Sequence, residues 1–102
     1  MSGRAAPFAV TLFASVALLL GACGKPPSRN ECDALLDHYV ELLVTSDRPG
    51  TSAAELHKLQ LQARQKAVTD PEFVQCNKRV SRRAYDCAMS ASNADKLEQC
   101  LL

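Results

Sequence analysis

Five cysteines are the side chains of this sequence whose type and spacing could support chemistry: Cys23, Cys32, Cys76, Cys87 and Cys100. The last four are separated by 44, 11 and 13 residues, so they contain no CxxC pair and match neither a zinc site nor a thiol redox motif. An even number of cysteines in a short exported chain is typical of structural disulfides. We therefore expect two disulfides and no metal or cofactor, provided that the N-terminal segment directs export.

Other candidates for catalysis are few. His38 and His57 fall in different predicted helices, with no serine, cysteine or acid at a spacing typical of a catalytic site. We interpret both as surface residues and predict no catalytic residues and no enzyme. Asp33, Asp37 and Glu41 recur every four residues and form an acidic stripe on one helix face, which could hold a hard cation. A solvated helix face is the simpler interpretation, and a compensating basic partner is expected.

The first 22 residues have the composition of a secretory signal peptide. Arg4 is the only charged residue before a mainly apolar run, FAVTLFASVALLL, at residues 8–20. The run ends in Leu20-Gly21-Ala22-Cys23, which is an aliphatic residue and two small residues before a cysteine. This pattern resembles the lipobox of bacterial lipoproteins, and residues 1–22 are interpreted as a lipoprotein signal peptide.

The resemblance implies that a diacylglycerol is attached to the Cys23 sulfur, that residues 1–22 are removed, and that the new amino group is acylated, for example with palmitate. Several acyl chains anchor a protein stably where one binds only marginally. Residues 23–29 would then be a lipidated tether that holds the domain off the bilayer. Because Gly24 is not the aspartate that retains such lipoproteins at the inner membrane, we expect the outer membrane, with the domain facing the periplasm or the exterior. An uncleaved membrane helix is the alternative, although the apolar run is short for one.

Residues 30–102 are predicted to form an all-α domain, a small disulfide-stapled bundle of three to four helices. The apolar residues recur at helical spacing, and turn residues separate the helical segments. The expected helices are residues 29–45, 52–68, 71–90 and a short one from about residue 94. Capping motifs mark three of the starts, at Ser28 with Glu31, Ser52 with Glu55 and Asp70 with Pro71.

The cysteine pairing is constrained by the third predicted helix. If residues 71–90 are one unbroken helix, Cys76 and Cys87 lie roughly 16 Å apart at 1.5 Å per residue, well beyond the ~7 Å limit between bridged α-carbons. Two pairings then stay open, Cys32 with Cys76 plus Cys87 with Cys100, or Cys32 with Cys87 plus Cys76 with Cys100. We prefer the first, because a tight hairpin after residue 90 would bring Cys87 and Cys100 face to face.

A second, looser resemblance covers about a third of the chain. The pattern F-x2-C-x10-C-x12-C from Phe73 to Cys100, with Tyr85 two residues before Cys87, is similar to short four-cysteine helical lipoproteins of unassigned activity in proteobacterial genomes. It implies a helical, disulfide-linked domain and supplies no reaction, substrate or partner.

Lys78, Arg79, Arg82 and Arg83 are the densest group of charges. At helical spacing they would form one basic patch on the outer side of the third helix, opposite its cysteines. The patch could meet lipid phosphates, an acidic envelope polymer or the acidic stripe of the first helix. A solvated face is the simpler interpretation, since outside the signal peptide 11 Lys and Arg residues balance 11 Asp and Glu residues.

These features predict a membrane-anchored lipoprotein that acts as an interaction or structural module of the cell envelope. Its expected partners are membrane lipid, through acylated Cys23, and an unknown envelope protein or polymer. Nucleic acid is not an expected partner, because export separates the chain from it and aromatic residues are few. The alternatives are an accessory or inhibitor of an envelope enzyme, acting through the turn at residues 47–51, and a thiol redox protein.

Overall fold

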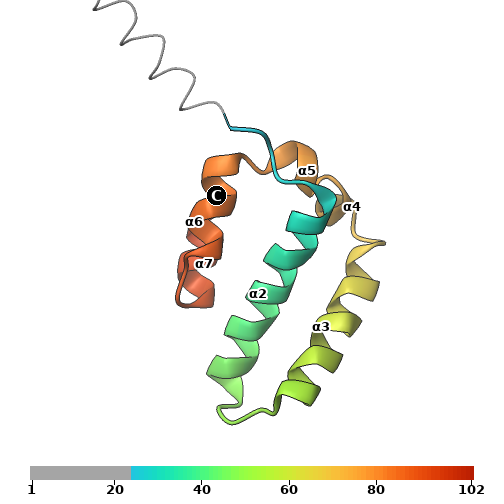
Figure 1. Ribbon diagram of the computed structural model, residues 1–102, viewed down its shortest axis with the longest axis vertical. Coiled ribbons are helices and arrows are strands. Elements are labelled where there is room, and N and C mark those ends of the chain that lie inside the picture. Colours follow the sequence, from blue (N-terminus) through green and yellow to red (C-terminus); the bar gives the residue numbers. More distant parts are fainter. Residues whose placement is uncertain (1–23) are drawn as a thin grey trace, which may run out of the picture.

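The computed structural model describes residues 24–102, which form helices and short connections with no strand among them (Figure 1). The helices are α2 (Arg29–Asp47), α3 (Ala53–Ala67), α4 (Pro71–Val74), α5 (Cys76–Arg79), α6 (Arg82–Met89) and α7 (Ala94–Cys100). The predicted all-α fold with two disulfides is confirmed. The predicted signal peptide and the lipidated Cys23 lie outside the described residues. Within residues 24–102, no helix is long and apolar enough to cross a membrane.

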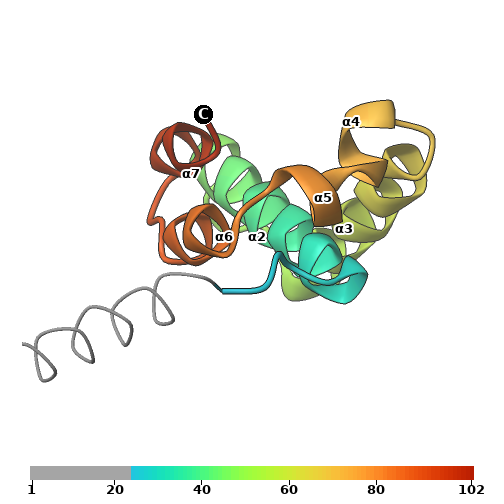
Figure 2. The same ribbon diagram turned by 90° about the horizontal axis from the view of Figure 1, so that it is seen from above.

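Helix α2 is the centre of the described bundle, and α3, α5, α6 and α7 all pack against it (Figure 1; Figure 2). It begins as the capping motif predicts. The Ser28 hydroxyl accepts a hydrogen bond from the backbone N–H of Glu31 at 3.2 Å, and the Glu31 carboxylate accepts one from the backbone N–H of Ser28 at 2.9 Å. The helix runs two residues past its predicted end. The turn after it contains Gly50 at a φ of 90°, a left-handed conformation that favours glycine.

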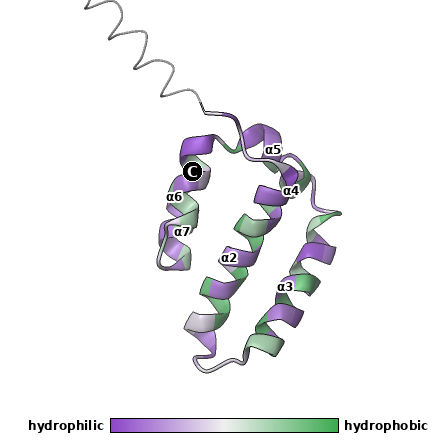
Figure 3. Ribbon diagram, viewed as in Figure 1, coloured by the Kyte–Doolittle hydropathy of each residue, from purple (hydrophilic) through white to green (hydrophobic). Residues whose placement is uncertain are grey.

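Helix α3 returns along α2 and packs mainly on it. Its start is capped by Ser52, whose hydroxyl accepts a hydrogen bond from the backbone N–H of Glu55 at 3.1 Å. Ala67, which is 8% exposed, is the one buried residue of α3. Hydrophobic and hydrophilic residues alternate along both α2 and α3 (Figure 3), as expected for helices that their neighbours cover only in part.

The predicted single helix at residues 71–90 is wrong, because three short helices occupy that segment. The backbone leaves the helical conformation at Val80, which has a φ of −89° and a ψ of 125°, and at Ser81. The Ser81 hydroxyl accepts a hydrogen bond from the backbone N–H of Ala84 at 3.0 Å and so starts α6 as a new helix. Serine competes for backbone groups in this way and favours helix starts over helix interiors.

The two disulfides have the preferred pairing. Cys32 is bonded to Cys76 with their α-carbons 6.2 Å apart, and Cys87 is bonded to Cys100 with their α-carbons 5.7 Å apart. The first joins α5 to the start of α2, and the second joins α6 to α7. Cys76 and Cys87 are not bonded to each other, as predicted, although they lie in separate helices, α5 and α6, and not in one unbroken helix.

The hydrophobic core lies where α6 and α7 meet α2. Leu35, Tyr85, Ala88 and Leu97 are buried there in one cluster. Cys32 is fully buried at the start of α2, so the Cys32–Cys76 disulfide extends the covered region toward α5. The core is small, as expected for about 80 residues, and disulfides compensate for such a core.

Candidate functional site

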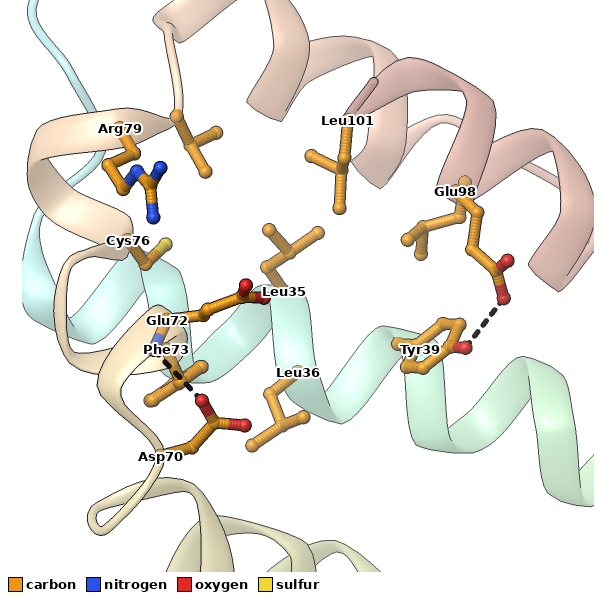
Figure 4. A pocket seen from close by; sticks show the side chains of 12 residues that line it. Leu35, Leu36, Tyr39, Asp70, Glu72, Phe73, Cys76, Arg79, Glu98 and Leu101 are labelled. Atoms are coloured by element: carbon orange, nitrogen blue, oxygen red, sulfur yellow. Dashed lines mark hydrogen bonds between the residues drawn. The ribbon is translucent and has the colours of Figure 1, made fainter.

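A groove of about 420 Å³ lies between α2, α4, α5 and α7 of the described domain (Figure 4). Its lining is Leu35, Leu36, Tyr39, Asp70, Glu72, Phe73, Cys76, Arg79, Val80, Leu97, Glu98 and Leu101. The lining surface is mainly apolar, with charged groups around it. Ligand sites in proteins commonly combine these two features.

The floor of the groove is provided by α2. Leu35, Leu36 and Tyr39 lie within little more than one helical turn and so share a face. Leu97 of α7 is 2% exposed and closes one side, while Cys76 is held at the other side by its disulfide to α2. Both walls are therefore fixed: α5 is bonded to α2, and α7 is bonded to α6, which packs on α2.

The polar groups around the groove are mainly acidic. Asp70 caps α4, and its carboxylate accepts a hydrogen bond from the backbone N–H of Glu72 at 2.9 Å. Glu98 of α7 accepts a hydrogen bond from the Tyr39 hydroxyl at 2.6 Å, and Figure 4 shows this pair spanning from α7 to α2. This bond, with partial burial, raises the pKa of Tyr39 above its ordinary value of 10.0. Arg79 is the one cation in the lining.

The polar groups of this groove can form hydrogen bonds and ion pairs with a ligand. The polar lining residues are three carboxylates, one guanidinium, and a tyrosine already bonded to a carboxylate, and the Cys76 sulfur is part of a disulfide. An apolar surface bordered by carboxylates suits a segment that carries apolar side chains next to basic ones. Among the described residues, no group of three or more His, Cys, Asp or Glu side chains is placed to hold a metal ion.

The predicted basic patch is not one face of one helix, because the break at Val80 and Ser81 separates its members. Lys78 and Arg79 belong to α5, and Arg82 and Arg83 belong to α6. Arg79 lines the groove, and Lys78 and Arg83 are exposed. Arg82 forms two hydrogen bonds of 2.8 Å with the two carboxylate oxygens of Glu31, and its guanidinium lies 5.1 Å from the centre of the Tyr85 ring.

The basic partner of the acidic stripe of α2 is a residue of α3 and not the predicted basic patch. Arg64 of α3 binds Asp37, with its Nε donating to Oδ1 at 2.9 Å and a second nitrogen donating to Oδ2. Glu41 lies 3.8 Å from His38. The carboxylate that meets the basic segment is instead Glu31, the capping residue of α2.

The prediction that His38 is a surface residue is wrong. Its ring is half-buried, and its Nε2 lies 3.0 Å from the carbonyl oxygen of Ala91, at the turn between α6 and α7. His57 is exposed, as predicted. The turn at residues 47–51, considered as a surface for enzyme regulation, is mostly exposed and is closed by the Thr51 hydroxyl, which donates to the Arg48 carbonyl oxygen at 2.7 Å.

Sequence reasoning did not identify the groove. Its Tyr39–Glu98 hydrogen bond joins residues 59 positions apart, and no local pattern marks such a pair. The chain matches no protein-family model, no curated protein and no solved structure. Its function is therefore argued from its own residues.

Proposed function

We propose that this chain is a lipoprotein of the bacterial cell envelope, anchored through acylated Cys23, whose helical domain binds an envelope protein in the groove. The lipobox-like sequence at residues 20–23 supports the anchor, and its Gly24 favours the outer membrane. The pairing of the other four cysteines also supports it, because no other cysteine of the chain is left to bond with Cys23. A free thiol is uncommon in an oxidising compartment, whereas an acylated sulfur is not exposed to this chemistry.

The observation that carries the binding function is the groove itself. Its floor and walls are mainly apolar, two disulfides fix the helices that form them, and three carboxylates border it, two at α4 and its start and one in α7. A segment with leucine-like side chains and neighbouring lysines or arginines would fill the apolar floor and pair with Asp70, Glu72 or Glu98. The proposed partner is thus a basic, amphipathic segment of another envelope protein.

The anchor is tested by the intact mass of the protein purified from bacterial membranes. The expected mass lacks residues 1–22, includes acyl chains, and is four hydrogens lighter than the fully reduced form because of the two disulfides. Replacing Cys23 with serine should abolish acylation while both disulfides still form. A native protein that keeps residues 1–22 or has an unmodified sulfhydryl at Cys23 would overturn the anchor.

The groove is tested by crosslinking in intact cells, followed by capture from solubilised membranes. Leu36→Gln places a polar side chain on the groove floor, and Leu61→Gln makes the same change on α3, where Leu61 is 46% exposed. A partner that binds the groove should be captured with the Leu61 variant and lost with the Leu36 variant. Equal capture by both variants would show that the groove is not the binding surface.

A thiol redox protein is the second candidate, because Cys87 is exposed and its disulfide borders a surface hollow with Ser90 and Lys96. An exposed disulfide is accessible to attack by a thiolate. Counting free thiols in protein taken rapidly from cells separates the two functions. A binding module should contain none, whereas a redox protein should contain a fraction with Cys87 and Cys100 reduced.

A further inference from the structure

The segment that follows Cys23 lies on the domain and is fastened to it. The Arg82 Nε donates a hydrogen bond to the carbonyl oxygen of Lys25 at 2.9 Å. Pro27 is fully buried. Gly24 passes so close to α6 that a Cβ at this position would come within 2.7 Å of the Arg82 Cγ, so the approach requires glycine. Residues 24–28 of the expected tether therefore lie against the domain.

Arg82 is itself held in place from the other side. Both oxygens of the Glu31 carboxylate bind its guanidinium, and Glu31 in turn caps α2 through Ser28. The ring of Tyr85 lies under the same guanidinium. One arginine thus connects the segment after Cys23 with the first turns of α2 and α6.

This fastening determines which end of the domain is nearest the proposed lipid. Gly24 directly follows the acylated Cys23, and consecutive α-carbons are about 3.8 Å apart. The α5 helix and the start of α6 lie at this end of the molecule, and the turn between α2 and α3 lies at the other end (Figure 1). Along α2 the two ends are separated by roughly 27 Å, at 1.5 Å per residue.

Exposed basic side chains are present on the segments at the fastened end. Lys25 is in the fastened segment, Lys78 is in α5, and Arg83 follows Arg82 in α6, and no ion pair is formed by any of the three in residues 24–102. Basic side chains close to a membrane surface are attracted to anionic headgroups within about a Debye length, which is roughly 8 Å at physiological salt. One residue of spacing brings this end of the domain within that distance.

We infer that the anchored domain is oriented, with the end that carries α5 and the start of α6 against the bilayer and Lys25, Lys78 and Arg83 in contact with phosphates of anionic phospholipids. The turn between α2 and α3 then points away from the membrane. This inference rests on the proposed acylation of Cys23. In this orientation the groove has a fixed height and direction relative to the membrane.

Single tryptophans can test this orientation, because the sequence contains none. Lys78→Trp places the reporter at the fastened end, and Lys58→Trp places it toward the far turn; both lysines are exposed, and each variant loses one positive charge. The acylated protein is purified from membranes and reconstituted into vesicles of brominated phosphatidylglycerol and phosphatidylcholine. Bromine quenches only nearby tryptophans, so the Lys78 variant should lose at least twice as large a fraction of its fluorescence as the Lys58 variant.

Three further measurements separate the effect of the anionic headgroups from that of the fastened segment. Vesicles of brominated phosphatidylcholine alone should quench the Lys78 variant less, because the anionic headgroups are absent; equal quenching would overturn the phosphate contact. Adding Gly24→Val, which blocks the close approach to the Arg82 side chain, should reduce the difference between the two reporters. Adding Arg83→Gln, a surface change, should weaken the dependence on phosphatidylglycerol even if the Gly24 variant is poorly produced.

The possible failures are distinguishable. If the intact mass shows no acyl chains, the proposed anchor is wrong and the inference falls with it. If the protein is acylated and both reporters are quenched to the same extent, the anchor stands and the orientation is overturned.

Discussion

Helices α2 and α3 are 19 and 15 residues long, and no disulfide joins them. Helices α6 and α7 have only 8 and 7 residues and are joined by the Cys87–Cys100 disulfide. Isolated helices shorter than about 12–15 residues are marginal in water, because few hydrogen bonds offset the cost of nucleation. The long pair, α2 and α3, has a correspondingly long interface, and α6 with α7 forms the short pair. The disulfide therefore joins the two helices that are too short to be stable through their contacts with each other alone.

The two pairs also differ in what they bury. Leu97 of α7 is 2% exposed and belongs to the core, together with Tyr85 and Ala88 of α6. In α3 only Ala67 is buried, and Leu61 is 46% exposed. The short pair therefore contributes more to the core per residue than α3 does, and it also forms one wall of the groove.

The largest expected effect comes from removing the core side chain of the short pair. Leu97→Ala should lower the free energy of unfolding by about 4 kcal/mol, because it removes a fully buried leucine and leaves a cavity. Leu61→Ala deletes the same atoms from an exposed position and should cost less than about 0.5 kcal/mol. Urea unfolding followed by circular dichroism measures both. Similar losses for the two variants would mean that α3 is as important to the core as α7.

Removing the disulfide of the short pair should have the next largest effect. Cys87 and Cys100 are 13 residues apart, and closing a loop of this length stabilises by about 3 kcal/mol on the chain-entropy model. The variant with both residues replaced by alanine should lose about that much. Hydrogen exchange should speed up first in α7, while α2 and α3 keep their protection. Uniform loss of protection along the chain would contradict the comparison.

The long pair is expected to depend little on its ion pair. Asp37 and Arg64 have side chains that are 27% and 41% exposed, so solvent screens their attraction. A double-mutant cycle with Asp37→Asn and Arg64→Gln should give a coupling energy below about 1 kcal/mol that decreases with added salt. A larger coupling that is insensitive to salt would show that this pair takes the place of a disulfide between α2 and α3.

The sequence predicts features that depend on neighbouring residues. Ser28 with Glu31, Ser52 and Asp70 start their helices as expected, because a cap needs only side-chain and backbone groups within three residues. The preferred disulfide pairing also follows from local geometry, since the turn after α6 brings Cys87 and Cys100 together regardless of the rest of the fold.

The sequence does not reveal features that depend on competition or on distant partners. The apolar spacing through Val80 fits one continuous helix, and it is the hydrogen bond from Ala84 to the Ser81 hydroxyl that favours a new helix start. His38 contacts a backbone carbonyl, a group that every residue has, so its burial leaves no signal in residue type. The groove depends on Tyr39 meeting Glu98 across 59 positions.

A pH-dependent effect on stability is expected at the contact that joins the two pairs of helices, Arg82 of α6 with Glu31 of α2. Hydrogen bonds from Arg82 and, secondly, from the backbone of Ser28 lower the pKa of Glu31 from 4.5 to about 2. A carboxyl whose pKa is lower in the folded state stabilises that state above its unfolded pKa. The contribution is present above about pH 4.5 and should disappear as the pH falls from there toward 2.

Glu31→Gln removes this titration and tests the sign. The gap in urea midpoint between the native protein and the variant should be largest above pH 5 and should shrink steadily on going from pH 4.5 to pH 2. Arg82→Gln should produce a similar pH dependence of the gap, and adding it to Glu31→Gln should add none, because either change removes the same interaction. A gap that stays constant down to pH 2 would mean that α2 and α6 are joined by the buried core alone, and that the fastening of residues 24–28 does not depend on the charge of Glu31.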